Sequence, residues 1–317
     1  MQKACSFSIF SIFVPDKKKD MLLKEVHIIG FWNKYSLDWY LNESVNILSG
    51  INGAGKTTLI DVISHLMTNR TEAKCLKKIG QADLIFSEGY SIEYKKALPD
   101  GEMQCLYKKD GAEIAFKEFR SQVRLGVIST FDANMPSLED YQKYIITRSD
   151  RIRSELDWSV ERLLEVYYKY VNSVSQEVEN AIKQNQLDKL PQYYQKKSEF
   201  LDLMNDMFKA TRKTIFESEE GLQFKLEDGT VITPNELSSG EKQLLILMIF
   251  VLAERELEFI SFWDEPEISL HIDWQRMLIR TVRKLNPNGQ LIISTHSPSI
   301  IYEGWEKMVV NMEDLLK

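Results

Sequence analysis

The stretch Gly50-Ile51-Asn52-Gly53-Ala54-Gly55-Lys56-Thr57-Thr58 fits the phosphate-binding pattern G-x-x-x-x-G-K-[ST]. The short apolar segment 44–48 before it predicts a strand, and residues 58–67 after it have helical spacing. A strand, a glycine loop and a helix turn backbone N–H groups and a helix N-terminus toward phosphates. We therefore predict a nucleotide site at 52–58, in which Lys56 reaches the β and γ phosphates and Thr57 ligates Mg²⁺.

The composition limits the class of protein. The chain has 317 residues, of which 44% are hydrophobic and 27% charged, as in a soluble globular protein of one large domain or two modest ones. The net charge of -7 does not favour a general nucleic-acid binder, so nucleic acid would need a local basic patch. Cys5, Cys75 and Cys105 form no C-x-x-C pair, which predicts reduced thiols, a cytoplasmic location and no cysteine metal site.

Two apolar segments call for an explanation. Residues 244–253 are about half the length needed to cross a bilayer, so we predict a buried core helix and no membrane association. Residues 4–14 have the apolar character of a signal peptide, but a nucleotide-binding domain follows directly. We interpret residues 1–20 as a disordered extension, or as an upstream start added to a protein that begins at Met21.

The first part of the chain predicts β structure around the glycine loop. Residues 22–29 alternate as a strand does. The aromatic and basic cluster 31–35 either contacts the nucleotide, with Asn33 in the site, or covers the sheet edge as a hydrophobic lid; the sequence favours neither. Short β segments between 84 and 108 are separated by turn residues and predict an antiparallel sheet beside a parallel one.

The middle of the chain predicts helices. No glycine occurs between Gly126 and Gly221, and apolar residues from 156 to 174 recur with the spacing of one long helix. Pro191 opens another. We predict a helical insertion at 137–220, either a hairpin or a small bundle. Its basic residues alternate with acids, which favours a solvated face over a nucleic-acid surface.

After Gly221 the pattern returns to β structure, with a hairpin at 222–232 and two helix–strand alternations. Such alternation implies a parallel α/β core. We therefore expect a discontinuous domain of residues 21–136 and 221–317.

Three further segments carry chemistry. Leu237-Ser238-Ser239-Gly240-Glu241-Lys242-Gln243 precedes the apolar helix and is a second anion-binding arrangement, although alone it would read as an ordinary helix cap. The apolar segment 259–263 ends in Asp264-Glu265, where a parallel strand would place Asp264 on Mg²⁺ and Glu265 on the attacking water. The segment 291–295 ends in His296, which would sense the γ-phosphate at the same edge.

The four segments together resemble the ATP-binding-cassette (ABC) ATPases. GINGAGKTT, LSSGEKQ, FWDEPEISLH and STHSP stand in the order of Walker A, signature, Walker B with D-loop, and switch histidine. The fold implied is an α/β ABC-type head, with a P-loop parallel sheet, an antiparallel β subdomain and the helical insertion. The insertion looks like the RecF/SMC branch, and the last two motifs are most similar to OLD-like AAA ATPases of bacteria. Many of those act in anti-phage defence beside a nuclease.

The resemblance implies a site shared between two copies. Two ATP molecules with Mg²⁺ would lie between two heads of a homodimer or larger oligomer, so that hydrolysis depends on assembly, and a separate effector protein would be controlled. In that arrangement Lys56, Glu265 and His296 are catalytic, and Thr57 and Asp264 hold the metal. The remaining residues act across the interface: Ser238, Ser239, Gly240 and Glu241 as the signature, and Ser269 and His271 as the D-loop.

The chain departs from the family in three places. Glu241 stands where transporters have glutamine, and Ile272 replaces the proline that follows SLH in the OLD-like group. Asp132 and Asn134 leave the Q-loop residue open. No nuclease motif follows His296, so we expect any nuclease to be another polypeptide.

Other functions remain open at this point. One is a RecF-like DNA-maintenance ATPase that binds DNA through the basic cluster Arg148, Arg151 and Arg153. Another is the ATP-binding subunit of a transporter, which the long insertion disfavours. A pseudo-ATPase scaffold is disfavoured because all the expected catalytic residues are present.

Overall fold

The computed structural model describes residues 21–96, 104–129, 154–302 and 304–317. The predicted extension 1–20 and the basic cluster at 148–153 lie outside the described residues, as do the Q-loop candidates Asp132 and Asn134. The chain divides into two compact units. Of the described residues, the phosphate-loop unit consists of 21–96, 104–129, 257–266, 288–302 and 304–317, and the signature unit of 154–256 and 267–287.

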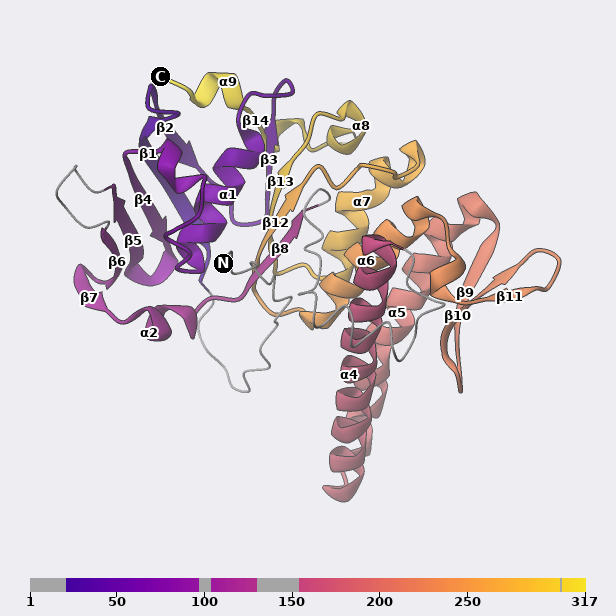
Figure 1. Cartoon of the computed structure of the whole chain (residues 1–317). Coiled ribbons are helices and arrows are strands. Elements are labelled where there is room, and N and C mark those ends of the chain that lie inside the picture. Colours follow the sequence, from indigo (N-terminus) through magenta and orange to yellow (C-terminus); the bar gives the residue numbers. More distant parts are fainter. Residues whose placement is uncertain (1–20, 97–103, 130–153, 303) are drawn as a thin grey trace. The chain divides into compact units, whose positions relative to one another are not determined.

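The phosphate-loop unit contains a five-stranded sheet in the order β14-β3-β13-β12-β8, in which all neighbouring strands are parallel (Figure 1). Every residue of β12 and β13 is buried, and apolar residues from the middle of each strand lie on both faces, as in a parallel sheet that is covered on both sides. In the register Asp264 pairs with Ser294, so their strands end at the same edge. The strands are β3 (Val45–Ser49), β8 (Leu125–Ser129), β12 (Ile260–Asp264), β13 (Gln290–Ser294) and β14 (Val309–Asn311).

A second sheet in this unit is antiparallel, in the order β2-β1-β4-β5-β6-β7, which confirms the predicted antiparallel sheet. Helix α1 (Lys56–Met67) contacts β5 of this sheet and β12 and β13 of the parallel one, and for this reason it is apolar on more than one side. The strands are β1 (Leu23–Phe31), β2 (Tyr35–Tyr40), β4 (Gln81–Phe86), β5 (Tyr90–Lys95), β6 (Gln104–Lys109) and β7 (Ala112–Ile114). The short helices are α2 (Phe116–Arg120), α8 (Pro298–Ile301) and α9 (Met312–Leu315).

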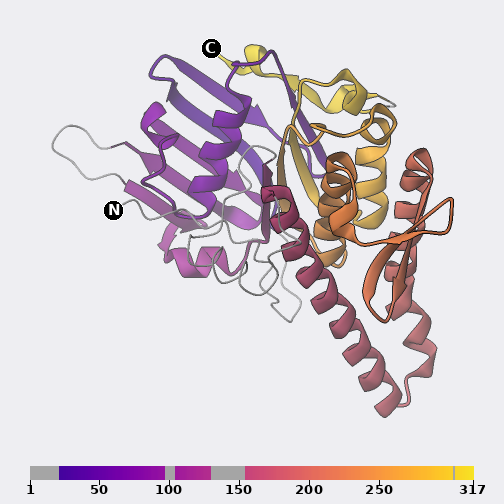
Figure 2. The ribbon, with the colours of Figure 1, turned by 45° about the vertical axis from the view of Figure 1, so that its right-hand side comes forward.

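The signature unit is built mainly of helices. Helices α4 and α5 form a hairpin that extends beyond α6 and the strands of this unit (Figures 1 and 2). Ser154 caps α4 by accepting a hydrogen bond from the Asp157 N–H, and a proline stands in the first turn of α5. The elements are α4 (Glu155–Lys183), α5 (Leu190–Phe208), α6 (Ser239–Ala253), α7 (Ile272–Leu285), β9 (Lys213–Ser218), β10 (Gly221–Leu226) and β11 (Val231–Ile232).

Aromatic rings join these elements into a core. The ring of Phe208 lies 5.0 Å from that of Phe224 and 6.0 Å from that of Trp274, so α5, β10 and α7 meet at one point. The Trp274 indole N–H donates to the Met207 carbonyl oxygen at 2.8 Å, which satisfies the one polar atom of a buried side chain. Among the described helices of the chain, none is long and apolar enough to span a membrane.

Several element predictions are confirmed: the long helix from residue 156 onward, the helix that opens at Pro191, the β10–β11 hairpin and the apolar helix at 244–253. The predicted insertion also contains a strand. Strand β9 lies inside the range 137–220 and pairs along its whole length with β10. Arg212 has a left-handed φ of 57° that stops the helical run there. Helices α6 and α7 also share a unit with the hairpin, so the compact units differ from the predicted domain and insertion.

Candidate active site

The glycine loop joins β3 to α1 in the arrangement that the sequence predicts. Gly55 stands at the start of α1 with φ 103°, a conformation that favours glycine. The first turn of α1 has no acidic residue and no side-chain cap, so its backbone N–H groups are available to a phosphate. Asn52, Gly53 and Thr57 are exposed, whereas Ala54 is buried.

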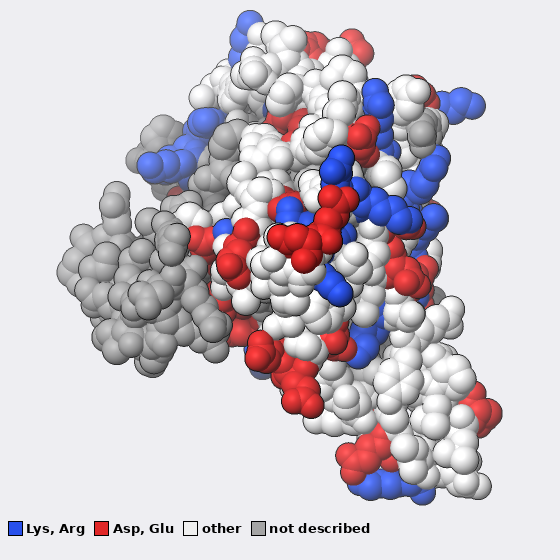
Figure 3. Space-filling view, turned by 90° about the vertical axis from the view of Figure 1, so that its right-hand side faces the viewer, with Lys and Arg blue, Asp and Glu red and all other residues white. Residues whose placement is uncertain are grey.

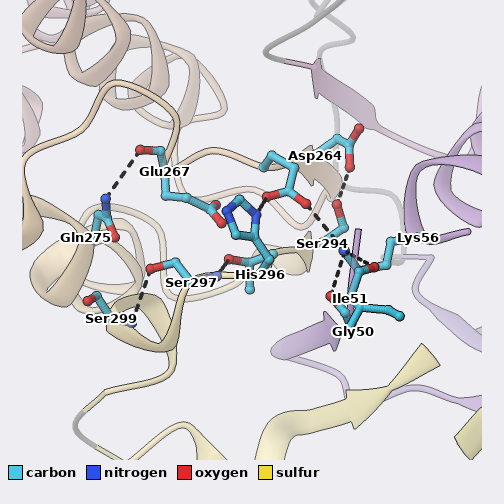
Figure 4. Close-up of polar contacts among 12 residues, drawn as sticks. Gly50, Ile51, Lys56, Asp264, Glu267, Gln275, Ser294, His296, Ser297 and Ser299 are labelled. Atoms are coloured by element: carbon cyan, nitrogen blue, oxygen red, sulfur yellow. Dashed lines mark hydrogen bonds and ion pairs between the residues drawn. The ribbon is translucent and has the colours of Figure 1, made fainter. Parts of the chain in front are cut away.

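Lys56 is the first residue of α1, and its side chain is 5% exposed. Its ammonium donates to the carbonyl oxygens of Gly50 at 2.9 Å and Ile51 at 3.2 Å (Figure 4). The same nitrogen lies 3.5 Å from Oε1 of Glu265. The buried cation is therefore held at the base of the loop by groups of both the loop and the β12 end.

The two predicted metal ligands lie together. Asp264 is the last residue of β12, and its carboxylate accepts hydrogen bonds from the hydroxyls of Ser294 and Thr57. Burial raises the pKa of the Asp264 carboxyl above its ordinary value, although these two hydroxyls act in the opposite direction. A hydroxyl and a carboxylate are hard oxygen donors of the kind that Mg²⁺ takes, so the residues fit this metal.

Glu265 follows with a left-handed φ of 50°, which is uncommon for a residue with a side chain. Its side chain is 10% exposed, and Oε2 is hydrogen-bonded to Nδ1 of His296. Lys56, Glu265 and His296, which the sequence assigns to catalysis, thus form a continuous chain of contacts. Backbone strain of this kind is frequent at functional sites.

The structure adds residues that the sequence did not single out. Ser294 bonds the metal-ligand candidate Asp264, and its signal was a small polar residue at the end of a fully buried strand. Glu313 of α9 accepts a hydrogen bond from the Ile51 N–H at 3.2 Å, on the loop itself. Nothing in the local sequence around Glu313 indicates that contact.

Residues 31–35 were interpreted either as a nucleotide contact or as a hydrophobic lid on the sheet edge, and different residues of the cluster fit different interpretations. Phe31 is buried and stacks on Trp32 at 5.2 Å between ring centroids, as a hydrophobic lid would. Trp32 lies against the glycine loop, because a Cβ on Gly55 would stand 2.8 Å from its ring. Asn33 is exposed, and its N–H donates to the Gly30 and Lys78 carbonyl oxygens. A nucleotide contact by Asn33 stays a prediction.

The signature segment begins α6 in the other unit. Ser238 is the N-cap, and it forms a reciprocal capping box with Glu241. Ser238 and Ser239 are exposed, whereas Gly240 and Glu241 are buried. A 15-residue helix that starts with exposed serines can present N–H and hydroxyl groups to a phosphate.

The D-loop residues lie next to the signature within the same unit. A Cβ on Gly240 would stand 2.2 Å from the backbone oxygen of Ser269, so the position admits only glycine at this approach. Ser269 has a φ of 67°, and the exposed His271 caps α7. The signature and the D-loop are therefore in close contact where the backbone of Ser269 approaches Gly240.

The parallel sheet and the glycine loop before α1 give this chain a fold similar to that of an SMC head domain. The AAA ATPase domain family matches residues 124–301, more than half of the chain, and the chain belongs to that family. It is an ATPase.

Individual relatives agree with this assignment. The Septu protein PtuA of Bacillus thuringiensis is 23% identical over 306 residues, which are 89% of this chain and 73% of that protein. The Retron Vc95 probable ATPase of Vibrio cholerae is 32% identical over 87 residues, 24% of this chain and 17% of that protein. The SMC head domain of Thermotoga maritima has a similar fold, with a TM-score of 0.51, 16% identity and coverage of 88% and 90% of the two chains.

Proposed function

We propose that the chain is a Mg²⁺-dependent ATPase that dimerises on ATP and controls a separate effector, a nuclease in anti-phage defence. The observation that carries the catalytic part is the joined set of Lys56, Glu265 and His296 beside Thr57 and Asp264. The likeness to the Septu protein and to the retron ATPase supports the setting.

The residues have distinct roles in this proposal. Lys56 and the N-terminus of α1 stabilise the charge that develops on the phosphates, and Thr57 and Asp264 would hold the metal. Bound Mg²⁺ would supply neutralisation of phosphate charge. Glu265 accepts a proton from the attacking water, and His296 holds the Glu265 carboxylate in place through Nδ1.

The contacts of Glu265 also describe a resting site. Its two carboxylate oxygens are engaged by Lys56 and by His296. A γ-phosphate that attracts the Lys56 ammonium would draw it from Glu265. We infer that the carboxylate becomes available to water as the nucleotide arrives, which would limit unproductive chemistry.

If Ser238 acts on ATP bound to the other copy of the dimer, Ser238→Arg should have a specific effect. The large cation would block the exposed helix start from the partner's γ-phosphate, while the glycine loop stays intact. We expect ATP affinity of single copies to stay within about twofold, and kcat to fall by about 100-fold, as for loss of a positioned donor. Fluorescent-nucleotide binding at dilute protein and steady-state hydrolysis measure the two quantities.

Thr230→Arg is the matched control, since Thr230 is an exposed residue of the same unit in the β10–β11 turn. It should hydrolyse ATP as the wild type does. Normal kcat in Ser238→Arg would show that the signature does not act on ATP.

The described basic residues in and just after α5 do not favour the DNA-binding alternative. The basic residues of α5 and its C-terminal end are paired with carboxylates: Lys196 with Glu199, Lys197 with Glu217 and Lys209 with Asp206. The face in Figure 3 shows lysines and arginines mixed with acids. Such a surface lacks the one-sided charge that phosphate binding requires.

A further inference from the structure

A lysine of β9 contacts the signature at the start of α6, through the buried Glu241. Nζ of Lys213 lies 2.6 Å from Oε1 of Glu241, whose side chain is 1% exposed. The other oxygen of Glu241 accepts hydrogen bonds from the Ser238 N–H at 2.9 Å and the Ser238 hydroxyl at 2.8 Å. One buried carboxylate therefore connects Lys213 to the signature serine.

The charge of Glu241 is maintained by these contacts. Burial acts to raise the pKa of the Glu241 carboxyl, but hydrogen bonds from Lys213, Ser238 and Thr211 outweigh it and hold the pKa below its usual range. Thr211 and Lys213 both belong to the segment that follows α5 directly. The end of the helical hairpin thus supplies two of the donors to the signature.

The first turns of α4, at the beginning of the hairpin, contact residues on both sides of the signature. Asp157 and Glu161 are four residues apart and so lie on one face of α4. Oδ1 of Asp157 accepts from Lys242 at 2.5 Å, and Oε1 of Glu161 accepts from Asn235 at 2.5 Å. Asn235 and Lys242 flank the signature, and both carboxylates are about 5% exposed or less.

We propose that Lys213, with Asp157 of α4, is a positioning residue that ties the signature serine Ser238 to both ends of the helical hairpin. This rests on the proposed action of Ser238 on the partner's ATP. The hairpin is joined to the signature by charge pairs whose carboxylates are buried, so a displacement of the hairpin would move Ser238 and change hydrolysis. Both pairs are mostly buried, and the low dielectric there strengthens the attraction within each pair.

The test is Lys213→Met, which keeps the aliphatic stem and removes the ammonium. Ser238 would be displaced relative to the γ-phosphate, so kcat and ATP-dependent dimerisation should fall, kcat by about 10- to 100-fold as for a small misplacement of a reacting group. ATP affinity of dilute, monomeric protein should not change, because Lys213 is remote from the glycine loop in sequence and belongs to the signature unit. Lys213→Arg should restore most of kcat.

Lys197→Met is the matched control. Lys197 makes an equally short ion pair, 2.6 Å to Glu217, and the two lysines have similar exposure in the same unit. Glu217 lies on β9, outside the signature, and its other oxygen accepts from the Tyr167 hydroxyl of α4. Equal losses of kcat in the two variants would overturn the proposal. So would a wild-type kcat in Lys213→Met.

Two further variants keep the result interpretable. If Lys213→Met melts below the assay temperature, Glu241→Gln removes the charge but keeps an acceptor for Ser238, and it should lower kcat in the same way. Adding Lys213→Met to Glu241→Gln should then cost little more, because both act through one pair. Additive losses would contradict a shared path. If the wild-type protein does not dimerise on ATP, that result contradicts the proposed function. The coupling through Lys213 is contradicted only by the kcat values of the variants.

Discussion

Glu265→Gln is expected to lower kcat for ATP hydrolysis by about 10²- to 10⁴-fold, the usual contribution of a positioned general base. The amide keeps the shape of the side chain but cannot take a proton from water. ATP should still bind, since Lys56 and the glycine loop are unchanged. The ATP-bound dimer should therefore accumulate, and its mass in Mg²⁺-ATP can be measured by light scattering after size exclusion.

The control for Glu265→Gln is Glu93→Gln, which also breaks a carboxylate–lysine contact, with Lys108 at 2.6 Å on the antiparallel sheet. That variant should retain wild-type kcat. A Glu265→Gln protein that hydrolyses ATP within tenfold of wild type would assign the base to another group. A variant that neither hydrolyses nor assembles would contradict the ATP-dependent dimer.

The Glu265→Gln protein also tests the effector. If the ATP-bound assembly recruits a nuclease, immobilised variant should retain one from a bacterial lysate in ATP and release it in ADP. Retention that does not depend on the nucleotide would contradict ATP control of the partner.

Lys56→Met should have the second large effect, on binding itself. The variant removes the only ammonium that the described loop and strand ends place beside both the loop carbonyls and Glu265. A lost charge-assisted contact to phosphate is worth about 3 kcal/mol, so the Kd for ATP should rise about 100-fold. Isothermal titration with Mg²⁺-ATP measures the change.

Lys108→Met is a suitable comparison, because Lys108 pairs with Glu93 away from the loop. Its Kd should match that of wild type. If Lys56→Met bound ATP with unchanged Kd, the glycine loop would not be the phosphate site and the catalytic roles would have to be reassigned.

The local sequence pattern was enough to predict the glycine loop, the strand that ends at Asp264, the strand just before His296, and the helix after Ser238. These features depend on residues close in sequence, where spacing decides strand or helix. The role of Ser294 was not predicted, because it follows from the register that pairs it with Asp264. The Lys213–Glu241 pair joins residues 28 apart and depends on how β9 lies against α6.

In two places neighbouring residues differ in structure more than their sequence pattern indicates. The aromatic cluster at 31–35 was treated as one unit, but Trp32 and Asn33 both have left-handed φ values and face different surroundings. Strand β9 was included in the helical insertion because residues 213–218 carry no glycine or proline to mark the change. Its pairing with β10 decides its conformation, and that partner follows it in the chain.

The bonds of Lys56 in the resting site make nucleotide binding an exchange of partners. Two carbonyl oxygens and a carboxylate already accept from, or attract, the ammonium that ATP would need. The heat released on binding is then the difference between two sets of contacts, so it is smaller than the new contacts alone would give. Such a loop discriminates between anions. A small anion offers fewer acceptors than a triphosphate, so it competes poorly with the protein's own oxygens for the Lys56 ammonium.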